Sequence, residues 1–539
     1  MTNGVQMDLI ITARNIHTLT PAPAGTNAIS ALGITGGRIE RVGTRAQAEL
    51  WQAASRADYL DATITPGLVD AHVHPIWGQQ IARGTYLGKV TGSKHAAEFL
   101  SQQVGEVAPG EWIFAWGLEQ SAFGADTPSG ADFTETFPHN PVFVMLFDGH
   151  AALANAKALE QAHIEGAEPL AGAGQIIVDE AGKPTGFLRE ASAINRLKEA
   201  APPLTFEQKV KNTLATLRAM AKNGLTGGEM LDFDDPQSLQ VLAQIEAEGE
   251  LPLRLRVAPW VLSGHPKGRV QQIIDMQGIG GRRYCVRGAK MMIDGTIDNG
   301  SGWLAEPDAM GEGTHSAYAN TDEYLECLRA FDAAGVPTST HAIGDRGIEF
   351  VIEAIASLGH TSVYHRIEHI EEITDRAVDA LASTRVSASM QPTHCTHFLD
   401  PDGADAWSRR LGRERAKRAF RLRDVFEAAQ HLALGSDWPI ANFDPREIMA
   451  DAISRRHTKD PASRPITPEQ ALTNRQALQC YTRGVAGSNG STGGRIAVGE
   501  LADLTIFAAD PLQLSPEELA DVEIVATYVG GQRIAGATV

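Results

Sequence analysis

The chain has 539 residues, 43% hydrophobic and 21% charged, which is typical of a globular protein and excludes disordered, collagen-like and disulfide-scaffold chains. Its 47 Lys and Arg against 66 Asp and Glu give a formal net charge of −19, which argues against nucleic acid and anionic membrane surfaces as partners. The four cysteines form no CxxC pair, and neither a secretory signal nor a long apolar span is found in the sequence. We therefore expect a cytoplasmic protein.

The two ends of the chain share a pattern of short apolar runs separated by turn residues. Such runs are typical of paired antiparallel strands. They lie at residues 9–11, 31–34, 39–42, 502–507 and 524–529. The pattern predicts a small β-sandwich domain built jointly from residues 1–64 and 488–539.

Between the ends, strand-like runs alternate with helical stretches. Eight strand candidates cover residues 64–70, 142–147, 224–230, 284–292, 336–340, 364–368, 385–390 and 433–435. Repeated β-then-α units predict a parallel (β/α)8 TIM barrel over residues 65–487. The stretches near 76–140 and 153–203 are long for single connections, so we expect insertions there.

The first barrel strand leads into the segment Thr65-Pro-Gly-Leu-Val-Asp-Ala-His72-Val-His74-Pro75. In an extended chain His72 and His74 point the same way, because side chains alternate with a period of two. Two imidazoles on one face can chelate a cation, although paired histidines also occur on ordinary surfaces. The metal-binding interpretation gains weight from further candidate ligands at later strand ends.

Three such candidates come directly after later strand candidates. His341 follows 336–340, His369 follows 364–368, and Asp437 follows 433–435. In a barrel the carboxyl ends of the strands meet at one face, where enzymes of this fold keep their active sites. The positions predict a metal centre at that face.

Lys290 lies inside an apolar strand candidate. A buried ammonium must pair, snorkel or be modified. Lys290 either pairs with a carboxylate such as Asp294 or Glu229, or is carboxylated by CO₂ and becomes an anionic metal ligand. Glu229, at a neighbouring strand end, is a rival ligand.

Taken together, these motifs resemble the amidohydrolase superfamily, and within it the amidohydrolase family 3 branch that includes N-substituted formamide deformylases. The resemblance extends over nearly the whole chain. It is carried by the motifs PGLVDAHVH at 66–74, DGH at 148–150, HAIGD at 341–345, EH at 368–369, GSDWP at 435–439 and GRIAVGELADL at 494–504.

The resemblance implies a metal-dependent amidohydrolase that cleaves a C–N bond of a small molecule. The implied ligands are His72, His74, Lys290, His341, His369 and Asp437. In such a centre the metal activates a water molecule and Asp437 acts as general base. The implied cofactor is a divalent metal, one or two per chain, with zinc expected and manganese, iron or cobalt as alternatives.

Other residues at the strand ends are candidates for substrate contact. His150 is a catalytic candidate that could orient a carbonyl or stabilise an oxyanion. Trp77, Trp303, His394 and Trp438 either line the substrate pocket or pack in the loops around it.

Two alternative functions stay open. The same metal frame could carry out deamination or decarboxylation, although Glu368 directly precedes His369 and should point away from it. A barrel that has lost catalysis would be a non-enzymatic subunit, but all six candidate ligands are retained here. A homodimer is expected because dimers are common among such barrels.

Overall fold

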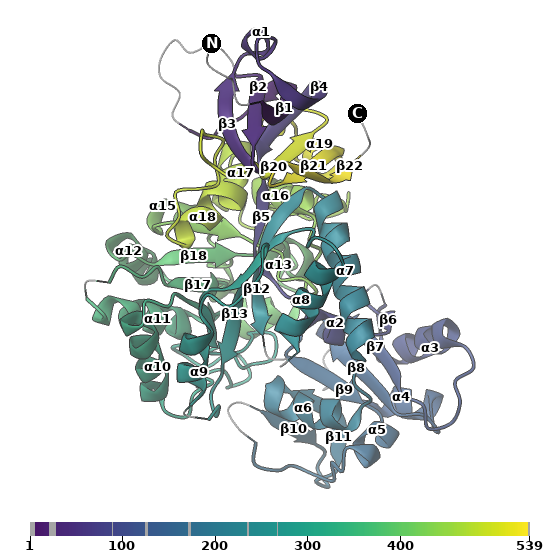
Figure 1. Cartoon of the computed structure of the whole chain (residues 1–539). Coiled ribbons are helices and arrows are strands. Elements are labelled where there is room, and N and C mark those ends of the chain that lie inside the picture. Colours follow the sequence, from purple (N-terminus) through teal and green to yellow (C-terminus); the bar gives the residue numbers. More distant parts are fainter. Residues whose placement is uncertain are drawn as a thin grey trace.

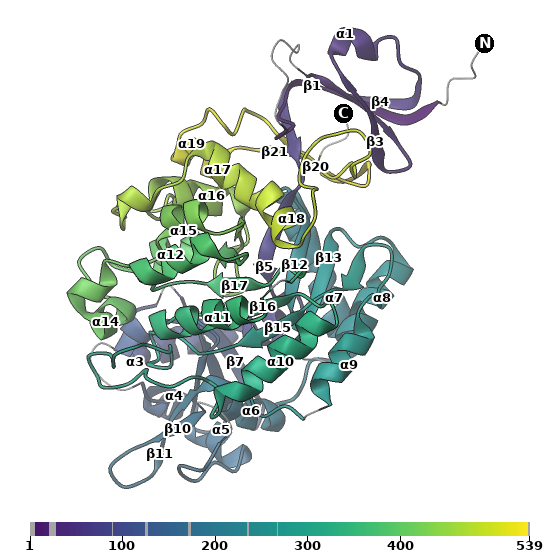
Figure 2. The same ribbon diagram turned by 90° about the vertical axis from the view of Figure 1, so that its left-hand side faces the viewer.

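The computed structural model describes residues 6–20, 29–88, 90–123, 128–170, 174–233, 237–266, 268–359 and 361–536. Figure 1 shows three parts: a sheet made from the purple and yellow ends of the chain, a central barrel, and a blue unit below it. Figure 2, turned by 90°, again places the blue unit and the terminal sheet at opposite ends of the molecule.

Both ends of the chain form one seven-stranded sheet in the order β22-β21-β20-β4-β1-β2-β3. β4 joins the two ends, because it pairs with β1 on one side and with β20 on the other. The core of this sheet includes the buried residues Ile11, Leu32, Ile64 and Ile506. The strands are β1 (Met7–Ile16), β2 (Ala31–Thr35), β3 (Arg38–Gly43), β4 (Ala53–Pro66), β20 (Leu504–Phe507), β21 (Ile524–Val529) and β22 (Gln532–Gly536).

The central sheet confirms the predicted barrel. Eight strands follow in parallel in the order β5-β12-β13-β15-β16-β17-β18-β19, and a bridge between Val73 and Trp438 joins the two edges. The strands are β5 (Leu68–Val73), β12 (Leu225–Phe233), β13 (Arg254–Val261), β15 (Ala289–Met292), β16 (Thr338–Ala342), β17 (Arg366–His369), β18 (Ser387–Met390) and β19 (Leu432–Leu434), with β14 (Tyr284–Val286) beside β13.

Amphipathic helices alternate with these strands. Several bury an apolar stripe against the barrel, as Val351, Ile352 and Ile355 of α11 do. The helices are α7 (Phe206–Lys222), α8 (Ser238–Glu248), α9 (Arg269–Met276), α10 (Thr321–Ala333), α11 (Asp345–Ser357), α12 (Asp375–Ser383), α13 (Pro392–Phe398), α14 (Ala406–Ala416), α15 (Leu422–Ala428) and α16 (Pro445–Ser454).

One predicted barrel strand is wrong and another was missed. Residues 142–147 correspond to β8 (Val142–Leu146), a strand of the inserted sheet, and the barrel instead uses β13. β8 looks like a barrel strand because it is continuously apolar and buried on both faces. β13 was missed because Arg254, Arg256 and Pro259 interrupt its apolar pattern.

The inserted unit between β5 and β12 is built on a six-stranded sheet in the order β10-β11-β9-β8-β7-β6. Both expected insertions contribute to this unit. Its strands are β6 (Thr85–Tyr86), β7 (Ile113–Leu118), β8, β9 (Ala151–Ala154), β10 (Gln175–Val178) and β11 (Pro184–Arg189), and its helices are α3 (Ser93–Val104), α4 (Ala131–Thr136), α5 (Ala156–Gln161) and α6 (Glu190–Ala200). The turn between β8 and β9 carries His150 to the mouth of the barrel.

The remaining helices are short. They are α1 (Arg45–Ala48), α2 (Gly78–Ile81), α17 (Asn474–Gln479), α18 (Val485–Ser488) and α19 (Pro516–Asp521), with 3-10 turns at Gln120–Phe123 and Pro468–Gln470 and a π-helical turn at Cys480–Gly484. Within the described ranges, none of the helices has the length and apolar character needed to cross a bilayer.

Candidate metal centre

The carboxyl ends of the barrel strands surround a pocket. All six candidate ligands line this pocket. His72 and His74 come from the end of β5, Lys290 from β15, His341 from β16, His369 from β17, and Asp437 from the segment after β19.

Backbone hydrogen bonds place Asp437 beside β5. The Asp437 amide donates to the carbonyl of His72 at 2.7 Å, and the His74 amide donates to the carbonyl of Trp438 at 3.0 Å. Gly435 permits this approach, because a Cβ at this position would lie only 2.6 Å from the backbone nitrogen of His72. The closure of the barrel thus brings the first and last predicted ligands together.

His72 is oriented by a buried carboxylate. Its Nδ1 lies 2.9 Å from Oε2 of Glu368, which leaves Nε2 facing Oδ1 of Asp437 at 3.3 Å. Burial lowers the pKa of His72 to about 4, and the nearby Lys290 ammonium acts in the same direction. The ring is therefore neutral at pH 7, which is the form that binds a metal ion.

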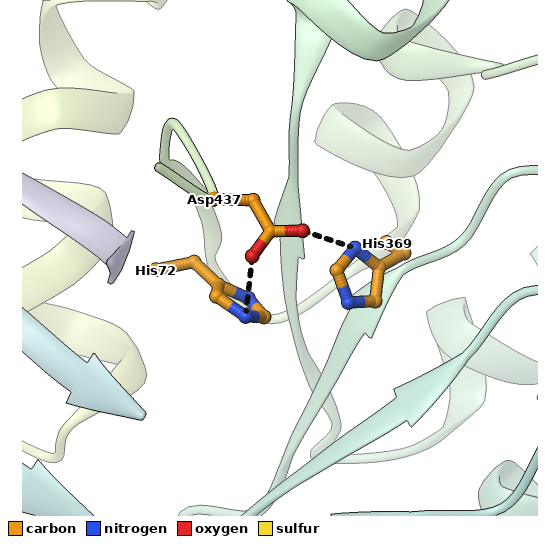
Figure 3. A group of neighbouring side chains, drawn as sticks. All are labelled: His72, His369 and Asp437. Atoms are coloured by element: carbon orange, nitrogen blue, oxygen red, sulfur yellow. Dashed lines mark ion pairs between the residues drawn. The ribbon is translucent and has the colours of Figure 1, made fainter. Parts of the chain in front are cut away.

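Asp437 lies between the histidines, as Figure 3 shows for His72 and His369. Nε2 of His74 is 2.8 Å from Oδ1 of Asp437, and Nδ1 of His369 is 3.9 Å from Oδ2. Burial opposes the charge of this carboxyl, but its neighbour His72 and the hydrogen bond from His74 hold its pKa well below the usual range. An ionised carboxylate therefore lies among buried imidazoles.

His369 and Asp437 both adopt a left-handed backbone conformation, with φ of 75° and 56°. Such conformations are costly for residues other than glycine and are concentrated at functional sites. Nδ1 of His369 also lies 2.9 Å from Oε1 of Gln391, which fixes the ring.

Lys290 is buried in the same cluster, with Nζ 3.3 Å from Nε2 of His72. Burial lowers its pKa to about 8. The carboxylates weighed as its partners are engaged elsewhere. Asp294 accepts hydrogen bonds from the amides of Gly344 and Trp303, and Glu229 lies 3.2 Å from Arg256.

His341 completes the cluster from β16. Its ring centroid lies 4.5 Å from that of His369, and its Nε2 is 3.0 Å from the carbonyl oxygen of Gly295. Burial holds its pKa well below the usual range. It is therefore a second neutral imidazole beside His369.

These residues fit a divalent metal ion. One ligand atom from each of His72, His369 and Asp437 lies within 4.8 Å of the others. Nδ1 of His74 is buried and has no hydrogen-bond partner among the described residues. Neutral imidazoles and a carboxylate are the donors that zinc and similar first-row ions prefer.

His150 lies at the edge of the pocket, with its ring centroid 5.4 Å from that of His341. Its Nδ1 is 2.9 Å from Oε2 of Glu190, whose Oε1 accepts a hydrogen bond from Ser301 at 2.5 Å. Burial opposes a charge on the imidazole, but Glu190 outweighs it and raises the pKa to about 9. Glu190 was missed by sequence reasoning, because only folding brings β11 and α6 beside His150.

The four predicted substrate contacts divide into two groups. Trp77 and His394 line the pocket, with the Trp77 ring 5.1 Å from His74 and the His394 ring 6.1 Å from His369. Trp438 instead packs against Phe443 at 6.2 Å, and Trp303 packs against Phe350 at 5.3 Å and borders a neighbouring cavity.

Several pocket residues were not predicted. Trp260 was not predicted because its strand, β13, was missed. Glu371 was not predicted because it belongs to no recognisable motif. Glu371 lies only two residues beyond a predicted ligand, and that proximity was the one signal that could have found it. The further lining residues include Phe147, Asp148, Asp298, Trp407 and Phe420.

Comparisons with known proteins agree with this architecture. A profile of the amidohydrolase family matches residues 60–535. The chain is 27% identical to the putative amidohydrolase YtcJ of Bacillus subtilis over 87% of this chain and 88% of that one. It is 26% identical to an N-substituted formamide deformylase of Arthrobacter pascens over 97% of both chains.

Solved structures show the same fold. An uncharacterised metal-dependent hydrolase from Pyrococcus horikoshii superposes with a TM-score of 0.71 at 21% identity, over 94% of this chain and 99% of that one. The profile match over most of the chain defines the class: the protein belongs to the amidohydrolase family. The family resemblance expected from the sequence motifs is thereby confirmed.

Proposed function

We propose that the protein is a metal-dependent hydrolase that cleaves the C–N bond of a small-molecule amide, such as an N-acyl amine, an N-formyl amine or a cyclic amide. The observation that carries the proposal is the arrangement of His72, His74 and His369 around the ionised carboxylate of Asp437 in one buried pocket. The similarity to an N-substituted formamide deformylase supports the reaction class.

The metal would be held by His72, His74, His341, His369 and Asp437, with zinc as the expected ion. A bound divalent cation supplies a water of lowered pKa and polarises the substrate carbonyl. Lys290, carboxylated on Nζ by CO₂, would add an anionic oxygen ligand to the set. Glu368 and Gln391 would orient His72 and His369 through their second ring nitrogens.

Asp437 is the proposed general base. Its carboxylate would take a proton from the attacking water and pass it to the leaving nitrogen. His150, held as a cation by Glu190, would donate a hydrogen bond to the carbonyl oxygen as negative charge develops there. The two residues then act on opposite ends of the reaction, one on the proton and the other on the oxygen.

The pocket walls favour a substrate with an apolar portion. The aromatic side chains of Trp77, Phe147, Trp260 and Phe398 line it together with Ile440. Aromatic walls with a few polar groups are typical of small-molecule sites. We therefore expect amides with an aromatic or branched aliphatic substituent to be preferred.

Deamination receives no support from Glu368. This carboxylate contacts His72 at 2.9 Å and Arg366 at 2.5 Å, and it is absent from the described lining of the pocket. A glutamate so engaged is poorly placed to protonate a ring nitrogen of a substrate. Amide hydrolysis remains the better match.

A substrate panel tests the proposal. N-formyl, N-acetyl and cyclic amides with aromatic or aliphatic substituents are incubated with the metal-loaded protein, and release of free amine is measured. We expect amine from at least one amide class, released at least about 10²-fold more slowly by the Asp437→Asn variant. Release of ammonia from aminated rings, without any amide hydrolysis, would overturn the proposal in favour of deamination.

A further inference from the structure

A second cluster of metal-binding side chains lies outside the pocket, between α13 and α16. His397 is near the end of α13, Glu447 is in the first turn of α16, and His457 follows that helix. One ligand atom from each lies within 4.8 Å of the others. None of these three residues lines the pocket described above.

The two histidines approach the same carboxylate oxygen. Nε2 of His397 is 3.6 Å and Nε2 of His457 is 3.5 Å from Oε1 of Glu447. Zinc–nitrogen and zinc–oxygen bonds of about 2.1 Å place tetrahedral ligand atoms about 3.4 Å apart. The two observed separations are close to the edges of a zinc coordination polyhedron.

Asp451 is a second carboxylate beside this group, and its Oδ2 accepts a hydrogen bond from the Thr396 hydroxyl at 2.6 Å. Being four residues after Glu447 on α16, it lies on the same helix face. Its Oδ2 is 3.0 Å from Nε2 of His397. Its other oxygen accepts a hydrogen bond from the amide of Thr458 at 2.9 Å, which ties the segment after α16 to the helix. The two imidazoles and the Glu447 carboxylate form a donor set suited to zinc.

The remaining groups around Glu447 orient it and leave Oε1 accessible. Asn442 donates to Oε2 at 2.8 Å, and Nζ of Lys459 lies 3.7 Å from the same oxygen. The exposed fraction of the side chain rises from 5% for Glu447 to 16% for His397 and 32% for His457. The cluster thus has a fixed carboxylate and a path from solvent.

The two imidazole rings are stacked, with centroids 3.8 Å apart and an interplanar angle of 26°. The carboxylates of Glu447 and Asp451, taken with the Lys459 ammonium, carry a net negative charge, which favours a dication.

We propose that His397, Glu447 and His457 form a second divalent-metal site that joins α13 to α16. Because α13 also carries His394 and Phe398 into the pocket, an ion bound here would hold that wall of the pocket in place. Its role is to stabilise the fold, and it takes no part in the reaction. The site is independent of the proposed function.

Zinc binding to variants of the full chain tests this site. Protein stripped with a chelator is dialysed against zinc, and bound metal is measured by inductively coupled plasma mass spectrometry. His457→Ala is expected to bind about one equivalent less than wild type, since one of the three protein ligands of the site is lost. Glu447→Gln should lose the same equivalent, and Lys459→Ala, which contacts the same carboxylate without being a ligand, should keep it.

A variant that lacks a ligand of the pocket separates metal binding at this second site from metal binding in the pocket. In His72→Ala protein, zinc should still raise the unfolding temperature, and adding His457→Ala should abolish that rise. The proposal is overturned if wild type and His457→Ala bind equal zinc, which would leave the cluster as an ion-pair network. If the pocket binds no metal, the wild-type protein should still bind the one equivalent of zinc that depends on His457.

Discussion

Nε2 of His74 lies 2.8 Å from Oδ1 of Asp437, although these residues belong to the first strand of the barrel and to the segment after the last. This contact depends on barrel closure. It places the Asp437 carboxylate against the imidazoles of β5, and both its proposed role as ligand and its proposed role as base depend on that position.

Replacing Asp437 with asparagine should abolish most turnover. The amide keeps the size of the side chain but cannot take a proton, so we expect kcat to fall by about 10²–10⁴-fold, the usual contribution of general acid–base catalysis. Metal content should fall much less, because His72, His74 and His369 remain. Steady-state kinetics and metal content are measured on the same preparations of the variant. Asp379→Asn, at an exposed position, is the control. Retained activity would refute the assignment of the base.

Lys290→Ala should lower metal occupancy if the carboxylated lysine is a ligand. Short carboxylic acids such as acetate or propionate should then restore part of the metal content and activity, since they supply the missing carboxylate to the vacated space. His72→Ala serves as the control, because the same acids should not rescue it. Absence of rescue in Lys290→Ala would favour an unmodified lysine beside His72.

The ion pair of His150 and Glu190 should make stability depend on pH. The pKa of His150 is raised from 6.5 to about 9, so its contribution is complete below pH 6.5 and is lost as pH rises through about 9. The pKa of Glu190 is lowered, so its contribution is present above pH 4.5 and is lost on acidification. The ion pair therefore contributes most to the free energy of unfolding between pH 4.5 and 6.5.

A double-mutant cycle measures this coupling. The free energies of unfolding of wild type, His150→Gln, Glu190→Gln and the double variant are compared at pH 6 and pH 9.5. We expect a coupling of at most about 3 kcal/mol at pH 6, and a clearly smaller value at pH 9.5. A coupling that grows with pH would contradict a cationic His150.

Two tryptophans near the pocket should behave differently. Trp77 lines the pocket, so Trp77→Ala should raise KM or change substrate preference by about tenfold or more, a loss of about 1.4 kcal/mol in binding. Trp438 packs against Phe443 and the backbone of Gly78, so Trp438→Ala should cost about 3 kcal/mol of stability with little change in preference. The reverse result would exchange their roles.

The sequence predicts the positions of most candidate ligands well because they lie at strand ends in a barrel, where position along the chain determines position in space. Strand periodicity places His72 and His74 on one face, and the repetition of β-then-α units places His341, His369 and Asp437 at later strand ends. The family motifs around these residues strengthen the prediction, and the profile match confirms the family.

The features that could not be predicted depend on contacts between distant segments. Glu190 reaches His150 only because β11 packs beside β9 in the inserted sheet, and no spacing in the sequence encodes that pairing. β8 was misassigned because a central strand of any buried sheet has the same apolar pattern. Trp303 lies at a plausible position in sequence, yet its ring turns towards Phe350 of α11.

The central claim is that the cluster around Asp437 binds a catalytic metal ion. The most direct test is metal content per chain, measured by inductively coupled plasma mass spectrometry on His457→Ala protein purified without chelator, so that the second site does not contribute. We predict about one or two equivalents of a divalent ion, lost when His72→Ala is added. No bound metal, and none taken up on titration with zinc, would contradict the claim.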